Sequence, residues 1–321
     1  MSTAGGSRAV LAALAANLGI AVIKFIAFLL TASASMLAEA VHSLADSGNQ
    51  GLLLLGGKRS RREATSEHPF GFGRDRYVYG FLVALVLFSV GGLFALYEGV
   101  HKIANPHELD SPAIALGVLV VAIGLESWSF RTAIAESREL KGNASWVQFI
   151  RRAKVPELPV VLLEDFAALI GLALAMLGVG LSTLLDQPVW DGIGTTAIGV
   201  LLIAVAAVLV VETKSLLLGE AASPAAVARI TEALVGPGVL RVIHQRTLHL
   251  GPDEVLVAAK LSMPASSTLA DVAAAIDAAE ARVRAAEPSA GVIYLEPDID
   301  RGATDAVAGQ QPAPDVDRGI S

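Results

Sequence analysis

Six long apolar segments constrain the fold of this chain more than any other feature. A helix needs about 20 mostly apolar residues to cross a bilayer. The stretches of that length are 9–30, 36–57, 78–97, 112–130, 158–185 and 192–211. Hydrophobic residues make up 54% of the chain, more than an ordinary soluble domain carries. The sequence therefore predicts an α-helical polytopic membrane protein with six transmembrane helices in a transport domain over residues 1–213.

Basic residues gather in two of the connections between these segments. The connections after the second and fourth segments hold Lys58, Arg59, Arg61, Arg62, Arg74, Arg76, Arg131, Arg138, Lys141, Arg151, Arg152 and Lys154. The other three connections hold only Lys102. Because Lys and Arg mark cytoplasmic loops, both termini are expected in the cytoplasm. The high content of Ala, Gly and Val suits a bacterial inner (plasma) membrane.

Residues 214–300 read as a small soluble domain. Ser223 and Pro224 predict a helix start, and the helix should end at Gly236. Strands are expected at 239–250, 255–263 and 292–295, with a helix opened by the capping box of Thr268 and Asp271 between the last two. The order αββαβ predicts a two-layer, ferredoxin-like α+β domain that is cytoplasmic. Residues 301–321 are expected to be a disordered tail.

Ionisable residues inside the apolar segments carry the functional signal. His42 and Asp46 lie four residues apart, on one face of a helix, and can reach one metal ion. The alternative is a His–Asp hydrogen bond that joins two helices. Glu164 and Asp165 are adjacent in the fifth segment and point about 100° apart, so both can border one cavity. A carboxylate in the bilayer costs several kcal/mol, which favours a bound cation.

At these residues the sequence resembles the cation diffusion facilitator family of metal/proton antiporters. The resemblance runs from about residue 9 to 297. It is carried by HSLAD around His42, by HPFGFGRDRY from His68, by GPDEVLVAAK from Gly251, and by FIRRAKVPELPVVLLEDFAALIG, which looks like the branch with a Glu-Asp pair in the fifth helix. It implies six spans, a homodimer formed through the tail domain and the membrane helices, and no prosthetic group.

The resemblance also implies a ligand set. His42, Asp46 and Asp165 match the family's metal ligands, whereas Val161 stands where the main branches carry His or Asp. Glu164 would then supply the fourth ligand. For metal binding in the tail domain the sequence offers His244, His249 and Glu296. The two histidines are expected to be structural, with His249 on a strand surface.

Several other polar residues are accessory candidates. Glu39, Asn49 and Gln50 lie near His42 and Asp46 in the second segment, as neighbours of the ligands or as helix-packing contacts. His68 follows in the next loop. Glu126, late in the fourth segment, is a candidate for proton or metal entry.

These features predict a secondary transporter that exports a divalent transition metal, Zn²⁺ first, in exchange for protons. The chain has no cysteine, so the ligands must be His, carboxylate or backbone oxygen, which also suit Mn²⁺, Co²⁺ and Fe²⁺. The formal net charge of -7 argues against a nucleic-acid partner. The alternatives are a non-transporting membrane adaptor with the same fold and an intramembrane metal-dependent enzyme. HExxH is absent from the sequence.

Overall fold

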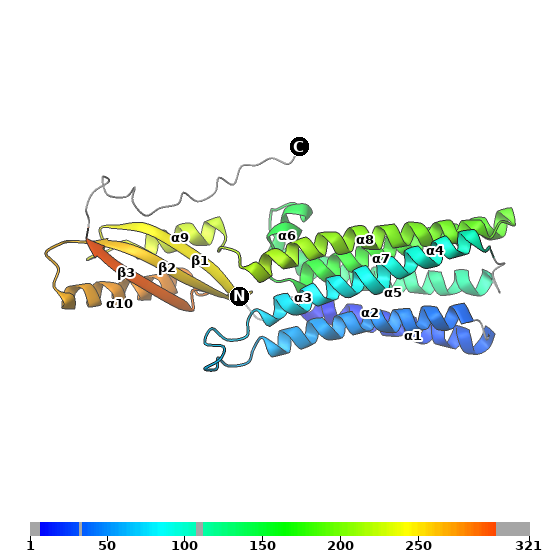
Figure 1. Cartoon of the computed structure of the whole chain (residues 1–321), viewed down its shortest axis with the longest axis horizontal. Coiled ribbons are helices and arrows are strands. Elements are labelled where there is room, and N and C mark those ends of the chain that lie inside the picture. Colours follow the sequence, from blue (N-terminus) through cyan, green and yellow to red (C-terminus); the bar gives the residue numbers. More distant parts are fainter. Residues whose placement is uncertain (1–6, 32–33, 107–111, 300–321) are drawn as a thin grey trace. The chain divides into compact units, whose positions relative to one another are not determined.

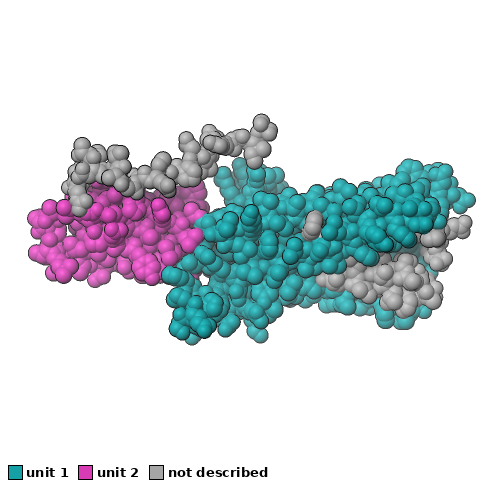
Figure 2. Space-filling view, in the orientation of Figure 1, with its two compact units in different colours: residues 1–220, 249–253 teal, residues 221–248, 254–321 magenta. Residues whose placement is uncertain are grey.

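The computed structural model describes residues 7–31, 34–106 and 112–299, without the side chains of residues 28, 30–31, 34–42, 45 and 88. The chain divides into two compact units, coloured separately in Figure 2. The first, here the helical unit, comprises Met1–Glu220 and His249–Asp253. The second, here the tail domain, comprises Ala221–Leu248 and Glu254–Ser321. The predicted disordered tail at 301–321 lies outside the described residues.

The helical unit consists of long helices that lie side by side (Figure 1). In order, its elements are α1 (Ser7–Thr31), α2 (Ala34–Arg59), α3 (Asp75–Val86), the π-helix η1 (Leu87–Leu93), α4 (Phe94–Ala104), α5 (Pro112–Lys141), α6 (Trp146–Arg152), α7 (Glu157–Leu185) and α8 (Val189–Leu218). Within the described residues, five helical stretches are long and apolar enough to cross a membrane: Ser7–Ala27, Asp75–Ala104, Pro112–Lys141, Glu157–Leu185 and Val189–Leu218. The 26-residue α2 is not among them, so the count of six spans remains a prediction.

Two local features of the helical unit were not predicted. The third span runs without a break from α3 through η1 into α4, and is longer than the predicted 78–97. Its π-helical turns include Gly91 and Gly92. Such π-helical bulges are rare in proteins as a whole, but many of those that occur lie at functional sites. The short α6 lies in a connection for which the sequence predicts basic charge but no helix. Ser145 and Gln148 start it with a capping box.

Glycines allow α4 and α8 to pack closely. A Cβ atom on Gly99 would lie 2.4 Å from the Thr196 backbone nitrogen, and one on Gly199 would lie 2.5 Å from the Leu96 nitrogen. Both separations are far below van der Waals contact, so only glycine fits at this crossing. Small residues at helix crossings are the usual means of packing helices in lipid.

The start of α7 is held by a buried ion pair. Arg76 of α3 donates from Nε to Glu157 Oε1 at 2.5 Å and from Nη2 to Glu157 Oε2 at 2.9 Å. The two side chains are only 9% and 6% exposed. Arg76 Nη1 also reaches Asp253 Oδ2 at 3.3 Å, within the same compact unit. This two-pronged contact fixes the position of α7 along its axis, two turns before Glu164 and Asp165.

The tail domain contains a three-stranded sheet in the order β1-β2-β3. Its elements are α9 (Pro224–Leu234), β1 (Arg241–Gly251), β2 (Glu254–Met263), α10 (Leu269–Ala286) and β3 (Val292–Ile299). Strands β2 and β3 pair in parallel, from Leu256 opposite Val292 to Met263 opposite Ile299. The element order and both N-caps are as predicted. Strand β3 continues four residues past its predicted end, where it supplies two partners for Lys260.

One face of this sheet is apolar and lies against the two helices. Alternate residues of β2 are buried, as expected for a strand with one covered face. Val257 and Leu261 pack there with Ile230 of α9 and Val283 of α10. On the other face, Lys260 pairs with Glu296 at 3.0 Å and with Asp298 at 3.2 Å, which raises the pKa of the lysine.

Glu287, the residue that follows α10, forms a second polar contact of the tail domain. Its carboxylate accepts hydrogen bonds from Ser289 Oγ, at 2.7 Å, and from Arg229 Nη2 of α9. Burial by itself would raise the pKa of Glu287. The hydrogen bonds from Ser289 and Arg229 outweigh burial and hold that pKa below its ordinary value. Ionised Glu287 therefore ties α9 to the end of α10.

Candidate metal centre

The acidic residues of α7 lie on one face of the helix, which starts at Glu157, the partner of Arg76. Glu157, Val161, Glu164 and Asp165 follow the spacing i, i+4, i+7 and i+8, which keeps them on one side of a helix. All four are buried. Val161 is fully buried and apolar, so the position expected to hold a ligand in the family's main branches is part of the hydrophobic core here.

Glu164 is held by two amides of α2. Its Oε1 accepts a hydrogen bond from Asn49 Nδ2 at 3.3 Å, and its Oε2 accepts one from Gln50 Nε2 at 3.0 Å. Gln50 Oε1 in turn accepts from Asn17 Nδ2 of α1 at 3.4 Å. Gln50 is fully buried and Glu164 is 8% exposed. This network joins α1, α2 and α7 and engages both carboxylate oxygens of Glu164.

Asp165 faces a different helix. Its Oδ2 accepts a hydrogen bond of 2.6 Å from Ser129 Oγ of α5, and both residues are almost fully buried. The adjacent acids of α7 therefore point to separate neighbours, as their 100° offset predicts. Ser129 was not among the predicted site residues. The sequence did offer one indication of its role, because Ser129 lies three residues after Glu126 and therefore on the same face of α5.

The remaining charges of the centre come from α1, α2 and α5. Asp46 of α2 is half-buried and interacts electrostatically with Glu164 and with Glu126. Glu126 is 5% exposed. Lys24 of α1 donates to Ser43 Oγ of α2 at 3.0 Å and is the basic group that interacts with Glu126. Four carboxyl groups thus act on one another inside the helical unit.

The structure places only part of the predicted ligand set. Asp46, Glu164 and Asp165 belong to one electrostatic cluster, whereas the side chains of His42 and Glu39 lie outside the described residues. Among the side chains that are described, no group of three or more His, Asp or Glu residues is arranged to hold a metal ion. The complete coordination shell therefore remains a prediction.

Comparison with known proteins decides the class of this helical unit. Residues 10–218 match the cation efflux transmembrane domain. The chain belongs to the cation efflux family. The expected resemblance to cation diffusion facilitators is confirmed at this level, and so is the expectation of a transporter class rather than an enzyme. The integral membrane location follows from the same match together with the apolar helices.

Several relatives of this cation efflux protein carry informative names. The mouse proton-coupled zinc antiporter SLC30A9, mitochondrial, is 34% identical over 224 residues, which cover 69% of this chain and 39% of that protein. Metal tolerance protein C4 of Arabidopsis thaliana is 32% identical over 221 residues, covering 67% and 47%. The cation-efflux pump FieF of Salmonella arizonae is 32% identical over 117 residues, covering 36% and 39%. The chain thus spans less than half the length of each of these relatives.

Two of the histidines that the sequence analysis named, His68 and His249, lie in different settings. His68 is exposed in the loop after α2, where its ring stacks on Phe72 with 4.6 Å between centroids. His249 is 7% exposed, and its Nδ1 lies 3.2 Å from the Gly251 carbonyl oxygen. The expectation that His249 sits on a strand surface is therefore wrong, because the end of β1 is covered.

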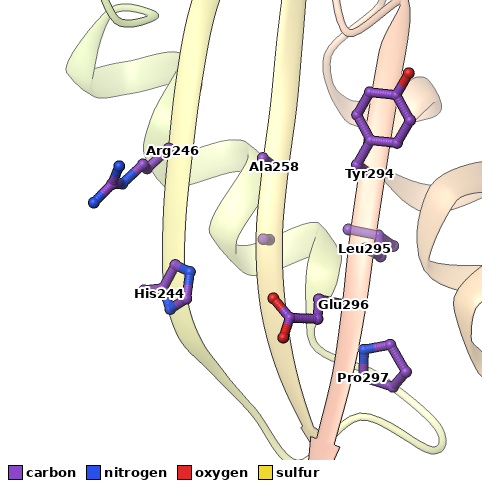
Figure 3. Close-up of a pocket in the computed structure, with 8 residues that line it drawn as sticks. His244, Arg246, Ala258, Tyr294, Leu295, Glu296 and Pro297 are labelled. Atoms are coloured by element: carbon purple, nitrogen blue, oxygen red, sulfur yellow. The ribbon is translucent and has the colours of Figure 1, made fainter. Parts of the chain in front are cut away.

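His244 lies on the open face of the tail-domain sheet, in a groove of about 400 Å³ (Figure 3). The groove is lined by His244, Arg246, Ala258, Ala259, Tyr294, Leu295, Glu296 and Pro297. Figure 3 shows His244 and Arg246 on one strand and the Glu296 carboxylate on another. Because Glu296 already pairs with Lys260, the groove does not offer a free carboxylate beside the histidine.

Proposed function

We propose that this protein exports a divalent transition-metal cation, Zn²⁺ first, from the cytoplasm in exchange for protons. The observation that supports this proposal is a cluster of carboxyl groups on α2, α5 and α7, three of which are buried. Glu126, Glu164 and Asp165 are each less than 10% exposed, and Asp46 interacts with two of them. Carboxyl groups at such positions are costly in a bilayer unless they bind something. The names of the relatives, which include a proton-coupled zinc antiporter, support the same cargo.

The proposed ligands of the ion are His42, Asp46, Asp165 and Glu164. Imidazole nitrogen with carboxylate oxygens, and no thiolate, suits Zn²⁺ and extends to Mn²⁺, Fe²⁺ and Co²⁺. Asp46 and Asp165 come from helices α2 and α7. The family branch with a Glu-Asp pair in the fifth span fits this set, because Val161 is embedded in the core. Asn49 and Gln50 would position Glu164 from the neighbouring turn of α2.

Proton exchange follows from the chemistry of these ligands. A metal ion binds only to neutral imidazole and ionised carboxylate, so binding releases any protons that the empty site carries. Histidine is the side chain whose ordinary titration range matches cellular pH. A site that alternates between protons and metal can use a proton gradient to move the ion.

Flux into proteoliposomes tests the proposal. The purified full chain is reconstituted, a pH gradient is imposed, and uptake of Zn²⁺, Mn²⁺, Fe²⁺ and Co²⁺ is followed with an enclosed indicator. We expect gradient-dependent Zn²⁺ flux that Asp165→Asn abolishes. The matched control is Asp191→Asn, because Asp191 pairs with Lys102 at 3.0 Å near the start of α8 and should not affect flux strongly. No flux of any of the four ions would refute transport and favour the adaptor alternative.

The membrane, the orientation and the oligomeric state of the transporter are part of the same proposal. We infer a bacterial inner membrane, with six spans and both termini in the cytoplasm, from the composition and from the basic connections after α2 and α5. Reporter fusions at the two ends test the orientation. We also infer a homodimer through the tail domain and the membrane helices, which light scattering of the detergent-solubilised chain would detect as twice the 33.1 kDa protomer mass.

A further inference from the structure

The short helix α6 has an outer side on which apolar and basic side chains lie together. Val147 is 65% exposed and Trp146 is 36% exposed, and the side chains of Arg151 and Arg152 are exposed as well. Val147 and Arg151 are four residues apart, so they share one side of the helix. Phe149, by contrast, is buried. One side of α6 thus belongs to the protein interior, and the other presents apolar surface next to positive charge.

Contacts with the core and with α8 place α6 at the level where the apolar part of the helical unit ends. Phe149 belongs to the buried cluster that also contains Leu209 of α8. Arg151 Nε lies 3.9 Å from Glu212 Oε1, and Glu212 is the first charged residue after the apolar segment 192–211. Figure 1 shows α6 beside this part of α8. In a membrane this is the depth of the lipid headgroups, because the hydrocarbon core ends where the apolar segments end.

Positive charge dominates the connection that contains α6. Between residues 131 and 154 the chain has six Lys or Arg residues and only two acidic ones, Glu136 and Glu139. Arg152 forms no ion pair with any residue that the structure describes. Lys141 lies over the Trp146 ring, with its Nζ 5.2 Å from the ring centroid. A partner for this side of α6 must therefore supply negative charge together with an apolar layer.

A bilayer surface that contains anionic phospholipid has both properties. Tryptophan is enriched at the membrane–water interface, where its ring reaches the acyl chains and its N–H stays near the headgroups. Arginine can lay its aliphatic stem along apolar surface while the guanidinium remains in the polar layer. Basic side chains close to the headgroups are attracted by their phosphates. The order of side chains on α6, with Phe149 inward and Trp146 and Val147 outward, matches this layering.

From this arrangement we propose that the outer side of α6 binds anionic phospholipids. Trp146 and Val147 lie among the upper acyl chains, and Arg151 and Arg152 bind the headgroup phosphates. The proposal goes beyond metal transport and rests only on the membrane location of the chain. Because α7 begins at Glu157, five residues after the end of α6, this contact also holds the connection that leads into α7 at the membrane surface.

Fluorescence quenching by brominated lipids tests the proposal. Trp128→Phe/Trp190→Phe leaves Trp146 as the single tryptophan. The full chain is reconstituted in vesicles of equal parts phosphatidylcholine and phosphatidylglycerol, with bromine on the acyl chains of one lipid or of the other. We expect both to quench Trp146, and the local concentration of phosphatidylglycerol to exceed that of phosphatidylcholine at least about fivefold, the ratio for one basic side chain near an anionic surface.

Arg151→Gln/Arg152→Gln removes the two charges and should bring the two local concentrations to within about twofold of each other. Arg246→Gln is the matched control. Arg246 is an exposed arginine of β1, in the tail domain, and like Arg152 it forms no ion pair within the described part of the chain. It should leave the preference for phosphatidylglycerol unchanged.

Equal quenching by the two lipids, or a preference that Arg151→Gln/Arg152→Gln retains, would overturn headgroup binding. No quenching of Trp146 by either lipid would also overturn it, because the outer side of α6 would then face protein or water. If the single-tryptophan background does not fold, the difference in quenching between the intact chain and Trp146→Phe gives the same comparison. The measurement needs no metal ion, so its failure is distinct from a failure of metal flux.

Discussion

The buried pair of Arg76 and Glu157 gives the sharpest test of how α7 is positioned. Glu157→Leu introduces an apolar side chain of similar size and removes both acceptors of the guanidinium. Among the residues that the structure describes, Arg76, 9% exposed in the intact protein, then retains only the ion pair with Asp253, whose side chain is 43% exposed. The charge of Arg76 remains buried and is largely uncompensated.

The expected cost follows from that remaining contact. Removing one partner of a buried ion pair typically costs about 3–5 kcal/mol, and an exposed pair such as that with Asp253 restores at most about 1 kcal/mol. The net loss is therefore about 2–4 kcal/mol. At roughly 2–4 °C per kcal/mol for a unit of this size, the apparent Tm should fall by about 4–16 °C.

Thermal unfolding in detergent, followed by the intrinsic fluorescence of the three tryptophans, measures this shift. Glu212→Gln is the control, because Glu212 faces Arg151 at 3.9 Å and that arginine is 72% exposed, so its loss should shift Tm by only a degree or two. The double variant Arg76→Met/Glu157→Leu removes both charges and should recover most of the stability. A single variant as stable as the control, or a double variant as unstable as the single one, would refute the reasoning.

Three further predictions address the centre, a helix crossing and the tail domain. Gln50→Leu removes a buried donor to Glu164 and should cost about 1.5–3 kcal/mol, seen as a lower Tm in the same assay. Gly99→Val brings a side chain into Thr196 and should cost at least about 1–3 kcal/mol, with Gly117→Val, where the added Cβ meets no atom, as control. Because the pKa of Glu287 is lowered by folding, its contribution is present above its unfolded pKa and lost as pH falls through the folded pKa. The protection factors of tail-domain amides, which correct for the slower intrinsic exchange in acid, should therefore fall at acidic pH, and fall less in Glu287→Gln; an equal fall in both would contradict this.

The sequence predicted long helices and the order of elements in the tail domain because local patterns determine both. Apolar length marks the long helices, and the capping residues Ser223 and Thr268 mark the helix starts of the tail domain. It did not predict the π-helical turns of η1, because they depend on how the glycines of that span meet α8 rather than on periodicity. The burial of His249 also depends on tertiary packing, since alternation along a strand does not say what covers its last residue.

The acidic residues of the candidate site could be predicted from the sequence, but their hydrogen-bond partners could not. Intramembrane acids are visible in the sequence because they interrupt apolar segments, and this identified Asp46, Glu164 and Asp165. Their partners are uncharged or lie on other helices, and nothing in the spacing of Ser129 or Asn17 shows which acid each will meet. Pairing is set by which helices become neighbours, and that follows from packing of the whole unit.

The two adjacent acids of α7 differ in what a bound ion would cost. An ion on Glu164 must displace amide hydrogen bonds to Asn49 and Gln50, worth about 1.5–3 kcal/mol each for bonds to a charged group. Those bonds join α2 to α7, so the ion would loosen the helices that it binds. An ion on Asp165 gives up at most the single bond from Ser129. Binding at Asp165 therefore leaves the α1–α2–α7 network intact, so of the two adjacent acids Asp165 would bind an ion at the lower cost in helix packing.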